Sequence, residues 1–463
     1  MSFITDGKNK INFTSLGCPR NLVDSEVMLG ILLKEGYEVT ESVEEADYLV
    51  VNTCAFLESS RKESTEAIEE LFRVKKEDAK VIVTGCMVSK HRSDIEKLFP
   101  KVHYFLGSGD VEGILKAVQS EDQGKKIGSA RSYLEAGEVP RQLSTPKHYA
   151  YLKIAEGCRK ACAYCIIPKI KGPLKSKSID QVVKEFKMLL GQGVKEIILI
   201  AQDLGDWGKD RGMNQGGLAD LLREILKTPG DYWLRLLYLY PDEITEELID
   251  ILKTDPRVCS YLDMPIQHIN NEMLKSMRRH TTGDEIKRLI NRLREEIPAM
   301  HIRTSLIVGF PGETEEKFEE LVAFIKKYPL NHIGIFKYSR EEGTPGAEME
   351  DQVPEEVKER RWRKIMKVQE KVVEKLHAEM VGVQMEVVVE GYHPESELLM
   401  VGRYFGQCPE IDGLVILNDP RGVKAFGERY IVEITGFAGV DLIGHVVAPI
   451  APKKRTRAKL SIV

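Results

Sequence analysis

The strongest constraint on the fold is the alternation of short apolar runs with amphipathic helical stretches between residues 149 and 338. Apolar runs of strand length lie at 149–155, 196–201, 233–239, 261–265, 301–309 and 332–338. Successive strand and helix units of this kind predict a parallel (β/α) barrel, complete or partial. A charged helical stretch at 354–380 is expected to pack on this barrel and to complete a unit spanning 147–380.

The same alternation occurs on a smaller scale before the barrel. Strand candidates at 11–16, 48–52, 81–85 and 104–107 predict a small parallel α/β domain over residues 9–120. Residues 121–146 are polar, contain Pro140 and Pro146, and read as a linker.

The pattern changes again after residue 380. Period-two strands with glycine punctuation, for instance 385–389, 414–417 and 430–434, predict a small antiparallel β-barrel over 381–449. Residues 450–463 form a basic tail whose plainest interpretation is a solvated terminus. The fold class is therefore multidomain α/β with an appended β-barrel.

Composition agrees with a globular protein. A chain of 463 residues with 42% hydrophobic content can bury a large core and form several domains. Residues 1–13 carry no apolar stretch of signal-peptide length, and no run of about 18 apolar residues occurs. We therefore expect a cytoplasmic monomer without a membrane partner.

Eight cysteines in such a chain are too few for a disulfide framework and favour metal or redox chemistry. Cys158, Cys162 and Cys165 follow the first barrel strand, which places them at the face where such barrels carry active sites. Their spacing allows one iron-sulfur cubane, and with no fourth cysteine nearby one iron stays open for a substrate or cofactor. The alternatives are a structural zinc site and chance.

This CxxxCxxC segment, with Tyr164 just before its last cysteine, resembles the radical S-adenosylmethionine (SAM) superfamily. The resemblance implies that SAM chelates the open iron of a 4Fe-4S cluster. It also implies that reductive cleavage of SAM yields a radical that abstracts hydrogen from an unactivated carbon. In such enzymes the cofactor performs the difficult step, while the protein orients it and excludes water.

Three more cysteines, Cys18, Cys54 and Cys86, each come directly after a predicted strand of the first domain. Parallel strand ends meet at one edge of a sheet, and turn signals beside each cysteine place all three on loops outside the core. We therefore predict a second cluster, again with one open iron; the alternative is three unrelated buried cysteines. Cys259 and Cys408 are expected to be structural.

The arrangement resembles the radical SAM methylthiotransferases over nearly the whole chain, with the last barrel similar to a TRAM domain. The resemblance implies two 4Fe-4S clusters and two SAM molecules, one as methyl donor and one as radical source. Residues 15–26 (SLGCPRNLVDSE) look like the RimO branch, which modifies an aspartate of protein twelve of the small ribosomal subunit at its β-carbon. Residues 264–268 (MPIQH), 305–314 (SLIVGFPGET) and 338–345 (YSREEGTP) also match the group. An electron donor such as flavodoxin or ferredoxin is implied as well.

The charge of the TRAM-like segment bears on the substrate. Between residues 381 and 445 there are ten acidic residues against four basic ones, a net charge of −6. The acids are Glu386, Glu390, Glu395, Glu397, Glu410, Asp412, Asp419, Glu428, Glu433 and Asp441. This sign repels phosphate and attracts a basic ribosomal protein, free or in the assembled subunit. Ordinary surface solvation is the plain alternative.

Other functions stay open at this point. A transfer RNA adenosine methylthiotransferase is the alternative within the enzyme class, and the basic tail could contact ribosomal RNA. A non-catalytic iron-sulfur carrier or RNA-binding adaptor is disfavoured, because a carrier would close its clusters with a fourth ligand. Residues 406–413 (GQCPEIDG) resemble the RimO branch's terminal motif, with Cys408 where alanine is expected.

Polar residues after the barrel strands are the predicted SAM contacts, because strand ends at this face reach the cofactor. They are Tyr164, Gln202, Asp203, Pro265, Gln267, Arg303 and Gly309. Arg303 could instead pair structurally, and Gly309 could be a turn glycine. No general base is assigned, since His268 and His280 read as structural. Residues 171–178 (KGPLKSKS) carry lysines where the family has arginines, which argues against bidentate contacts from this loop.

Overall fold

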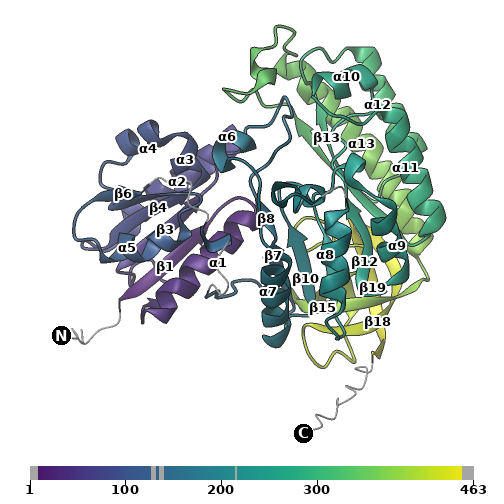
Figure 1. The fold of residues 1–463 in the computed structure, drawn as a ribbon. Coiled ribbons are helices and arrows are strands. Elements are labelled where there is room, and N and C mark those ends of the chain that lie inside the picture. The colour runs from purple at the N-terminus through teal and green to yellow at the C-terminus, as the bar shows by residue number, and fades with distance from the viewer. Residues whose placement is uncertain (1–8, 127–131, 135–139, 214–215, 451–463) are drawn as a thin grey trace.

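The structure is a computed structural model that describes residues 9–126, 132–134, 140–213 and 216–450. The chain forms an N-terminal α/β domain, an open parallel barrel and a small C-terminal barrel (Figure 1). The expected basic tail begins at residue 450 and otherwise lies outside the described residues. Within the described part of the chain, no helix has the length and apolar character needed to cross a membrane.

The N-terminal domain is a six-stranded, all-parallel sheet in the order β2-β1-β3-β4-β5-β6. Its strands are β1 (Lys10–Ser15), β2 (Glu38–Val39), β3 (Tyr48–Thr53), β4 (Lys80–Gly85), β5 (Tyr104–Gly107) and β6 (Gly124–Lys126). Its helices are α1 (Pro19–Lys34), α2 (Glu58–Val74), α3 (Cys86–Lys90), α4 (Arg92–Leu98) and α5 (Ile114–Gln119). The four predicted strands are present. The structure adds β2 and also β6, an edge strand inside the segment predicted as linker.

The second sheet follows chain order and is parallel throughout: β7 (Tyr149–Lys153), β10 (Glu196–Ile200), β11 (Trp233–Leu236), β12 (Val258–Asp263), β13 (His301–Val308) and β14 (His332–Lys337). Because β7 and β14 are its edges, the barrel is partial, one of the two predicted forms. A short two-stranded antiparallel sheet, β8 (Ala155–Glu156) with β9 (Lys175–Ser176), lies at the two ends of the segment that holds the cysteine loop.

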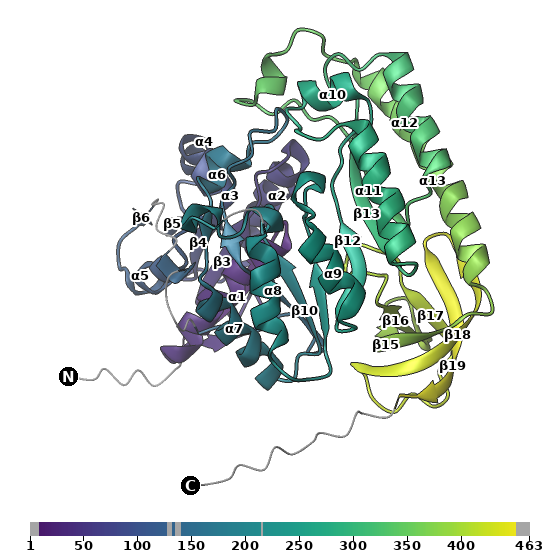
Figure 2. The ribbon, with the colours of Figure 1, turned by 45° about the vertical axis from the view of Figure 1, so that its right-hand side comes forward.

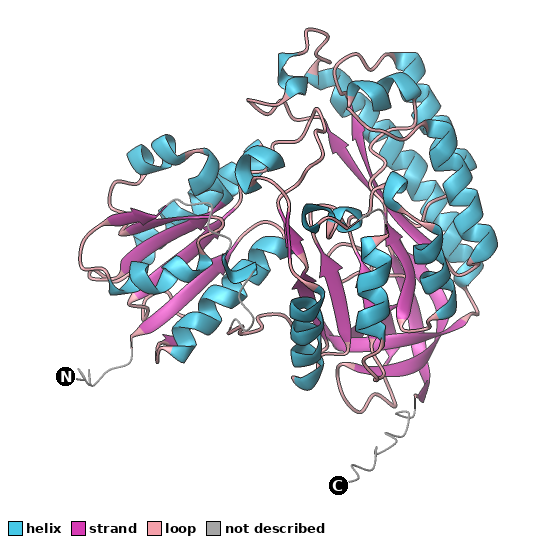
Figure 3. Ribbon diagram, in the orientation of Figure 1, coloured by secondary structure: helices cyan, strands magenta, loops and turns pink. Residues whose placement is uncertain are grey.

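Helices cover the outer face of this sheet (Figure 3). They are α7 (Ile179–Gly191), α8 (Gly217–Leu226), α9 (Glu246–Thr254), α11 (Gly283–Glu296) and α12 (Glu315–Lys327). Two short helices lie in the connections after β8 and β12: α6 (Ile167–Lys171), which packs on the N-terminal domain, and α10 (Asn271–Ser276). Side-chain caps fix where several begin, including capping boxes of Ser178 with Gln181 and Thr282 with Glu285. Single 3-10 turns lie at Val111–Gly113, Ser132–Leu134, Leu204–Asp206, Lys209–Arg211, Pro241–Glu243 and Pro345–Glu348.

The long helix α13 (Glu355–Met380) runs along the outside of the sheet to the C-terminal barrel (Figure 2). Trp362 donates its indole N–H to the carbonyl of Ile335 in β14 at 3.0 Å, so the helix packs on the barrel as predicted. The terminal barrel is closed: β15 (Gln384–His393), β16 (Ser396–Tyr404), β17 (Val415–Asp419), β19 (Asp441–Pro449) and β18 (Glu428–Ala438). Its β17–β19 pair is parallel, so the barrel is mixed and not wholly antiparallel as predicted.

This terminal barrel seals the end of the sheet where the parallel strands begin. Tyr149, the first residue of β7, donates its hydroxyl to Glu410 at 2.7 Å, and Tyr261 of β12 donates to Asp412 at 2.7 Å. Cys259 and Cys408 are buried in the apolar cluster that fills the concave face, as expected of structural cysteines. The opposite end, where the strands stop, is left for the cysteine sites.

Candidate functional site

Cys158, Cys162 and Cys165 lie in the loop between β8 and α6, at the end of the sheet where the strands stop. The backbone N–H of Lys160 donates to the Cys158 sulfur at 3.4 Å, and the Tyr240 hydroxyl lies 3.1 Å from the Cys162 sulfur. All three thiols are free. Burial, with the neighbouring thiols, raises the pKa of Cys158 to about 11 and that of Cys165 to about 12. Binding of a metal as thiolates would therefore release protons.

The second set of thiols comes from three adjacent strand ends. Cys18 follows β1 and caps α1, Cys54 follows β3, and Cys86 opens α3 directly after β4. A side chain at Gly17 would meet the Cys54 sulfur at 2.9 Å, and the Cys86 sulfur lies 3.7 Å from the Asn21 amide oxygen. The structure thus brings the three cysteines to one edge of the sheet.

One expectation about this set is wrong. Cys54 and Cys86 are only 7% and 6% exposed, and Cys86 is helical, although all three cysteines were expected on loops outside the core. The reason is that α3 begins at the very end of β4, without an intervening loop.

The two cysteine sets meet at one domain boundary. Helix α1 packs beside β7, and α3, which begins with Cys86, contacts α6, which follows Cys165. Arg20 crosses the boundary: it donates to the carbonyl of Ala201 at 2.9 Å and lies over the Tyr238 ring at 4.9 Å. On the far side, Glu341 after β14 accepts from Arg61 at 2.6 Å.

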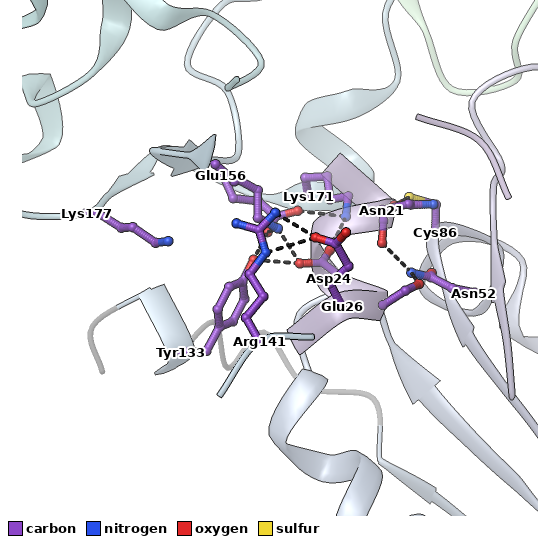
Figure 4. A network of polar contacts seen from close by, with 12 residues as sticks. Asn21, Asp24, Glu26, Asn52, Cys86, Tyr133, Arg141, Glu156, Lys171 and Lys177 are labelled. Atoms are coloured by element: carbon purple, nitrogen blue, oxygen red, sulfur yellow. Dashed lines mark hydrogen bonds and ion pairs between the residues drawn. The ribbon is translucent and has the colours of Figure 1, made fainter. Parts of the chain in front are cut away.

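A buried network of charges joins the domains behind the cysteines (Figure 4). Lys153 of β7 binds both Asp24 of α1 and Glu156, and Lys171 binds Glu156 at 2.7 Å. Tyr133 donates to Asp24 at 2.6 Å. Burial alone would raise the pKa of Glu156, but Lys153 and Lys171 outweigh it and hold that pKa below its usual range.

The lysines of the loop after the triplet serve this network and its neighbours. Lys171 lies beside Glu156, and Lys177 pairs with Glu185, which also binds Arg141 at 2.9 Å. Arg141 in turn holds Glu26 of α1 at 2.6 Å. These lysines therefore act as single cations in ion pairs, as their chemistry predicts.

Several predicted SAM contacts lie at the same face. Both amide atoms of Gln202 are buried and have no hydrogen-bond partner in the described structure. Gln267 has a left-handed backbone with φ of 69°, and the N–H of Gly309 donates to Glu313 at 2.6 Å. Pro265 accepts from Arg279 at 2.6 Å through its carbonyl. An orphaned amide at this position fits a polar cofactor that would supply its missing partners.

Arg303 is placed differently from the other predicted contacts. Its guanidinium pairs with Asp263 at 2.9 Å and with Asp412 of the terminal barrel at 3.4 Å. Arg303 therefore makes the structural ion pairs that were the alternative to a SAM contact.

Asp203 belongs to a buried acidic cluster with Asp206 and Glu243, whose ligand atoms lie within 4.8 Å of one another. Lys160 and Lys209 fill the cluster, each with its ammonium 2.6 Å from Glu243. Burial and the other two acids raise the pKa of Asp203 to about 7. Because two ammonium groups already occupy the cluster, we interpret it as a brace for the cysteine loop and not as a metal site.

Three residues at the site were not predicted. Arg279 stacks on Tyr240 at 3.7 Å and approaches the Cys162 sulfur at 4.0 Å, and Lys171 and Arg20 lie beside the N-terminal cysteines. Arg20 stands two residues after Cys18, so its proximity to that cysteine could have been read from the sequence. Nothing in the sequence marks Arg279.

Comparisons with known proteins agree with this arrangement. Residues 10–107 match the uncharacterized protein family UPF0004, residues 152–325 the radical SAM superfamily, and residues 381–447 the TRAM domain. The superfamily match implies SAM and a 4Fe-4S cluster.

Relatives match over the full set of domains. The ribosomal protein uS12 methylthiotransferase RimO of Protochlamydia amoebophila is 64% identical over 95% of this chain and 93% of its own length. The RimO proteins of Chlamydia felis and Bdellovibrio bacteriovorus are 58% and 44% identical, over 95% and 96% of this chain and 96% and 98% of their own lengths.

Among solved structures, the radical SAM methyltransferase TsrM of Kitasatospora setae, with cobalamin and a [4Fe-4S] cluster bound, matches with a TM-score of 0.55 and 17% identity. The match covers 85% of this chain and 81% of that one. At this identity the likeness shows the fold alone. The relatives found by sequence are far more similar and match over nearly the whole chain. They show that the chain belongs to the RimO family of radical SAM methylthiotransferases.

Proposed function

We propose that this chain transfers a methylthio group to the β-carbon of an aspartate of ribosomal protein uS12, using SAM and two 4Fe-4S clusters. The observation that carries the proposal is the meeting of two three-cysteine sites at one domain boundary, in a chain 64% identical to a RimO protein. A cluster held by three cysteines keeps one iron free for a ligand from outside the protein. Two such sites suit a reaction in which one makes a radical and the other holds the sulfur.

The donor sets fit these groups. Cys158, Cys162 and Cys165 would hold the cluster that binds SAM, and the N-terminal set, Cys18, Cys54 and Cys86, would hold the second cluster. The thiols are free and grouped, and thiolate is the usual ligand of iron-sulfur clusters. When bound, the clusters and SAM supply hydrogen abstraction from an unactivated carbon and a sulfur to place there.

The protein's own residues orient these groups and keep water away. Tyr240 and Arg279 fix Cys162, while the Lys153 and Glu156 network fixes the loop that begins at Gly157. We propose Tyr164, Gln202, Asp203, Pro265, Gln267 and Gly309 as SAM contacts. The orphaned amide of Gln202 is the strongest support among them.

The negative charge of the terminal barrel supports a basic protein partner. Fewer acidic side chains are available to that partner than the count from the sequence implies, because several are engaged within the protein. Glu390 and Asp412 are engaged with Arg403 and Tyr261, and Glu410 with two tyrosines of β7. Glu395 and Glu397, at the β15–β16 turn, are exposed. We propose that this turn attracts the basic ribosomal protein, free or in the assembled subunit. A flavodoxin- or ferredoxin-type donor and a cytoplasmic monomer remain predictions.

Mass spectrometry of uS12 and of transfer RNA from cells with and without the gene tests the proposal. The aspartate is expected to lose its methylthio group in the deletion strain and to regain it with the wild-type gene but not with Cys158→Ala. A methylthio group lost from a transfer RNA adenosine, with uS12 unchanged, would overturn the proposal in favour of the RNA enzyme.

A further inference from the structure

Arg20 has an unusual environment for an arginine inside a protein. It is half-buried at the domain boundary, two residues after Cys18, and its side chain reaches across to the barrel. One nitrogen donates to the carbonyl of Ala201 at the end of β10, at 2.9 Å, and the guanidinium lies 4.9 Å from the centre of the Tyr238 ring. Since Arg20 comes from the helix that begins beside Cys18 and its side chain ends at the strand ends of the barrel, it spans the boundary at which the two cysteine sets meet.

No acidic side chain in the described structure lies within 4.0 Å of the Arg20 nitrogens. Two arginines away from the cysteines are matched, since Arg141 pairs with Glu26 and Arg235 pairs with Glu196, each at 2.6 Å. Arg279, beside Cys162, is like Arg20 in having no acidic partner in the described structure. A guanidinium carries five N–H donors in a fixed fork, so most of those on Arg20 are free to bind a ligand. The thiolates of Cys18 and Cys86 are negative charges near Arg20, but neither accepts a hydrogen bond from the guanidinium, so its remaining N–H groups stay available to a ligand.

The surroundings favour the free N–H groups of the guanidinium as the binding surface. The Tyr238 ring lies 4.9 Å from the guanidinium carbon, and this tyrosine keeps a left-handed backbone with φ of 66°, a conformation that persists only where the surrounding structure holds it. A guanidinium with one nitrogen bonded and its other N–H groups without a partner can bind a carboxylate by two parallel hydrogen bonds. The residue after Ala201 is Gln202, whose unpartnered amide offers a further donor and acceptor at this strand end.

Two carboxylates could enter here, that of SAM and that of the substrate aspartate. Arg20 belongs to the N-terminal domain and stands beside Cys18, whereas the open iron for SAM belongs to the loop of Cys158 to Cys165. We propose that Arg20 binds the side-chain carboxylate of the substrate aspartate and thereby holds its β-carbon between the two cysteine sites. This inference rests on the proposed function and makes Arg20 the residue that distinguishes aspartate from asparagine.

The test measures binding of full-length uS12 to the enzyme with both clusters reconstituted, by anaerobic titration calorimetry. Wild-type uS12 is compared with a form whose target aspartate is replaced by asparagine. The wild-type enzyme is expected to bind the asparagine form about 10- to 100-fold more weakly, the effect of one charge-assisted bidentate contact. With Arg20→Met the two forms are expected to bind within about two-fold of each other, and Arg20→Lys is expected to fall between because it keeps the charge without the fork.

Arg61→Met is the matched control, since Arg61 also crosses the domain boundary from the N-terminal domain but is paired with Glu341. It should keep the full preference for aspartate even if domain docking weakens. Preference for aspartate retained in Arg20→Met, or absent from the wild-type enzyme, overturns the inference, as does a selective loss of SAM binding in Arg20→Met. A wild-type enzyme that binds uS12 without ever modifying it would instead refute the proposed function.

Discussion

The two cysteine sets have the same composition but are built by different means. Cys158, Cys162 and Cys165 lie within one eight-residue segment, so the local course of one loop brings them together. Cys18, Cys54 and Cys86 depend on β1, β3 and β4 being neighbours in one parallel sheet. The first site should tolerate changes elsewhere in the fold, whereas the second should require that these three strands stay paired. The two sites should therefore fail separately and by different routes.

The largest expected effect is that of Cys165→Ala. Without a third thiolate the barrel cluster has no stable site, so both SAM cleavage and uS12 modification should fall by about a thousand-fold or more, as for other losses of essential catalytic groups. Iron content should drop by about four atoms per chain. Formation of 5′-deoxyadenosine by the anaerobic enzyme is the direct measurement, and near-normal cleavage would show that these cysteines do not hold the SAM cluster.

Cys54→Ala tests the N-terminal set and asks whether that site can fail while the barrel site still works. It should lose a similar amount of iron and all methylthiolation of uS12, while 5′-deoxyadenosine continues to form within about ten-fold of the wild-type rate. The reason is that Cys54 lies in a different domain from the loop of Cys158 to Cys165. The matched control is Cys259→Ala, a buried cysteine outside both sets, which should keep the iron content of the wild type. Loss of both activities in Cys54→Ala would mean that the sites are one unit.

The network between the domains is the next test, because it is the structure that the two sites share. Lys153→Met removes a fully buried cation that binds Asp24 and Glu156 and leaves those carboxylates with less compensation. We expect a loss of about 4 kcal/mol in the free energy of unfolding, since breaking a buried ion pair from one side costs about 3–5 kcal/mol. Scanning calorimetry would measure it, against the exposed pair variant Arg421→Met, for which no measurable change is expected. A stability equal to wild type would show that the domains dock without this network.

The same contrast, between contacts within one segment and contacts between distant elements, explains how much of the fold and the site can be predicted from the sequence. The other strands of the two parallel sheets could be predicted because each contains an apolar run, whereas the edge strands β2 and β6 of the N-terminal sheet, which have none, could not. The cysteines could be grouped because each follows such a run. Pairing across domains could not be predicted. Tyr133 and Arg141 lie in a segment that reads as a linker, yet both are buried in the network, and β6 lies there too.

Single side chains show the same limit. Arg303 could face the cofactor or pair structurally, and only the fold places Asp263 and Asp412 beside it. The parallel β17–β19 pair also depends on how strands from a whole barrel close, which alternation within each strand does not encode. Contacts within one loop or one strand can therefore be predicted from the sequence, whereas contacts between distant elements cannot.

The smallest effect we predict concerns the turn that presents Cys86. Gly85 has φ of 101° and ψ of −161°, a conformation essentially restricted to glycine, and a Cβ there would lie 2.4 Å from the Asn52 side chain and 2.5 Å from the backbone of Thr53. Gly85→Ala should cost about 3 kcal/mol of stability, from strain and overpacking together, and should lower iron content in the N-terminal domain.

Gly36→Ala is its control, because Gly36 also has positive φ, 89°, but nothing lies within 4 Å of an added Cβ. It should cost about 1 kcal/mol and leave iron content unchanged. The barrel site should be intact in both variants, seen as unaltered 5′-deoxyadenosine formation. If Gly85→Ala left the iron of the N-terminal domain in place, the second site would not depend strictly on the geometry of the sheet. Its cysteines would then adjust locally, as those of the barrel loop do.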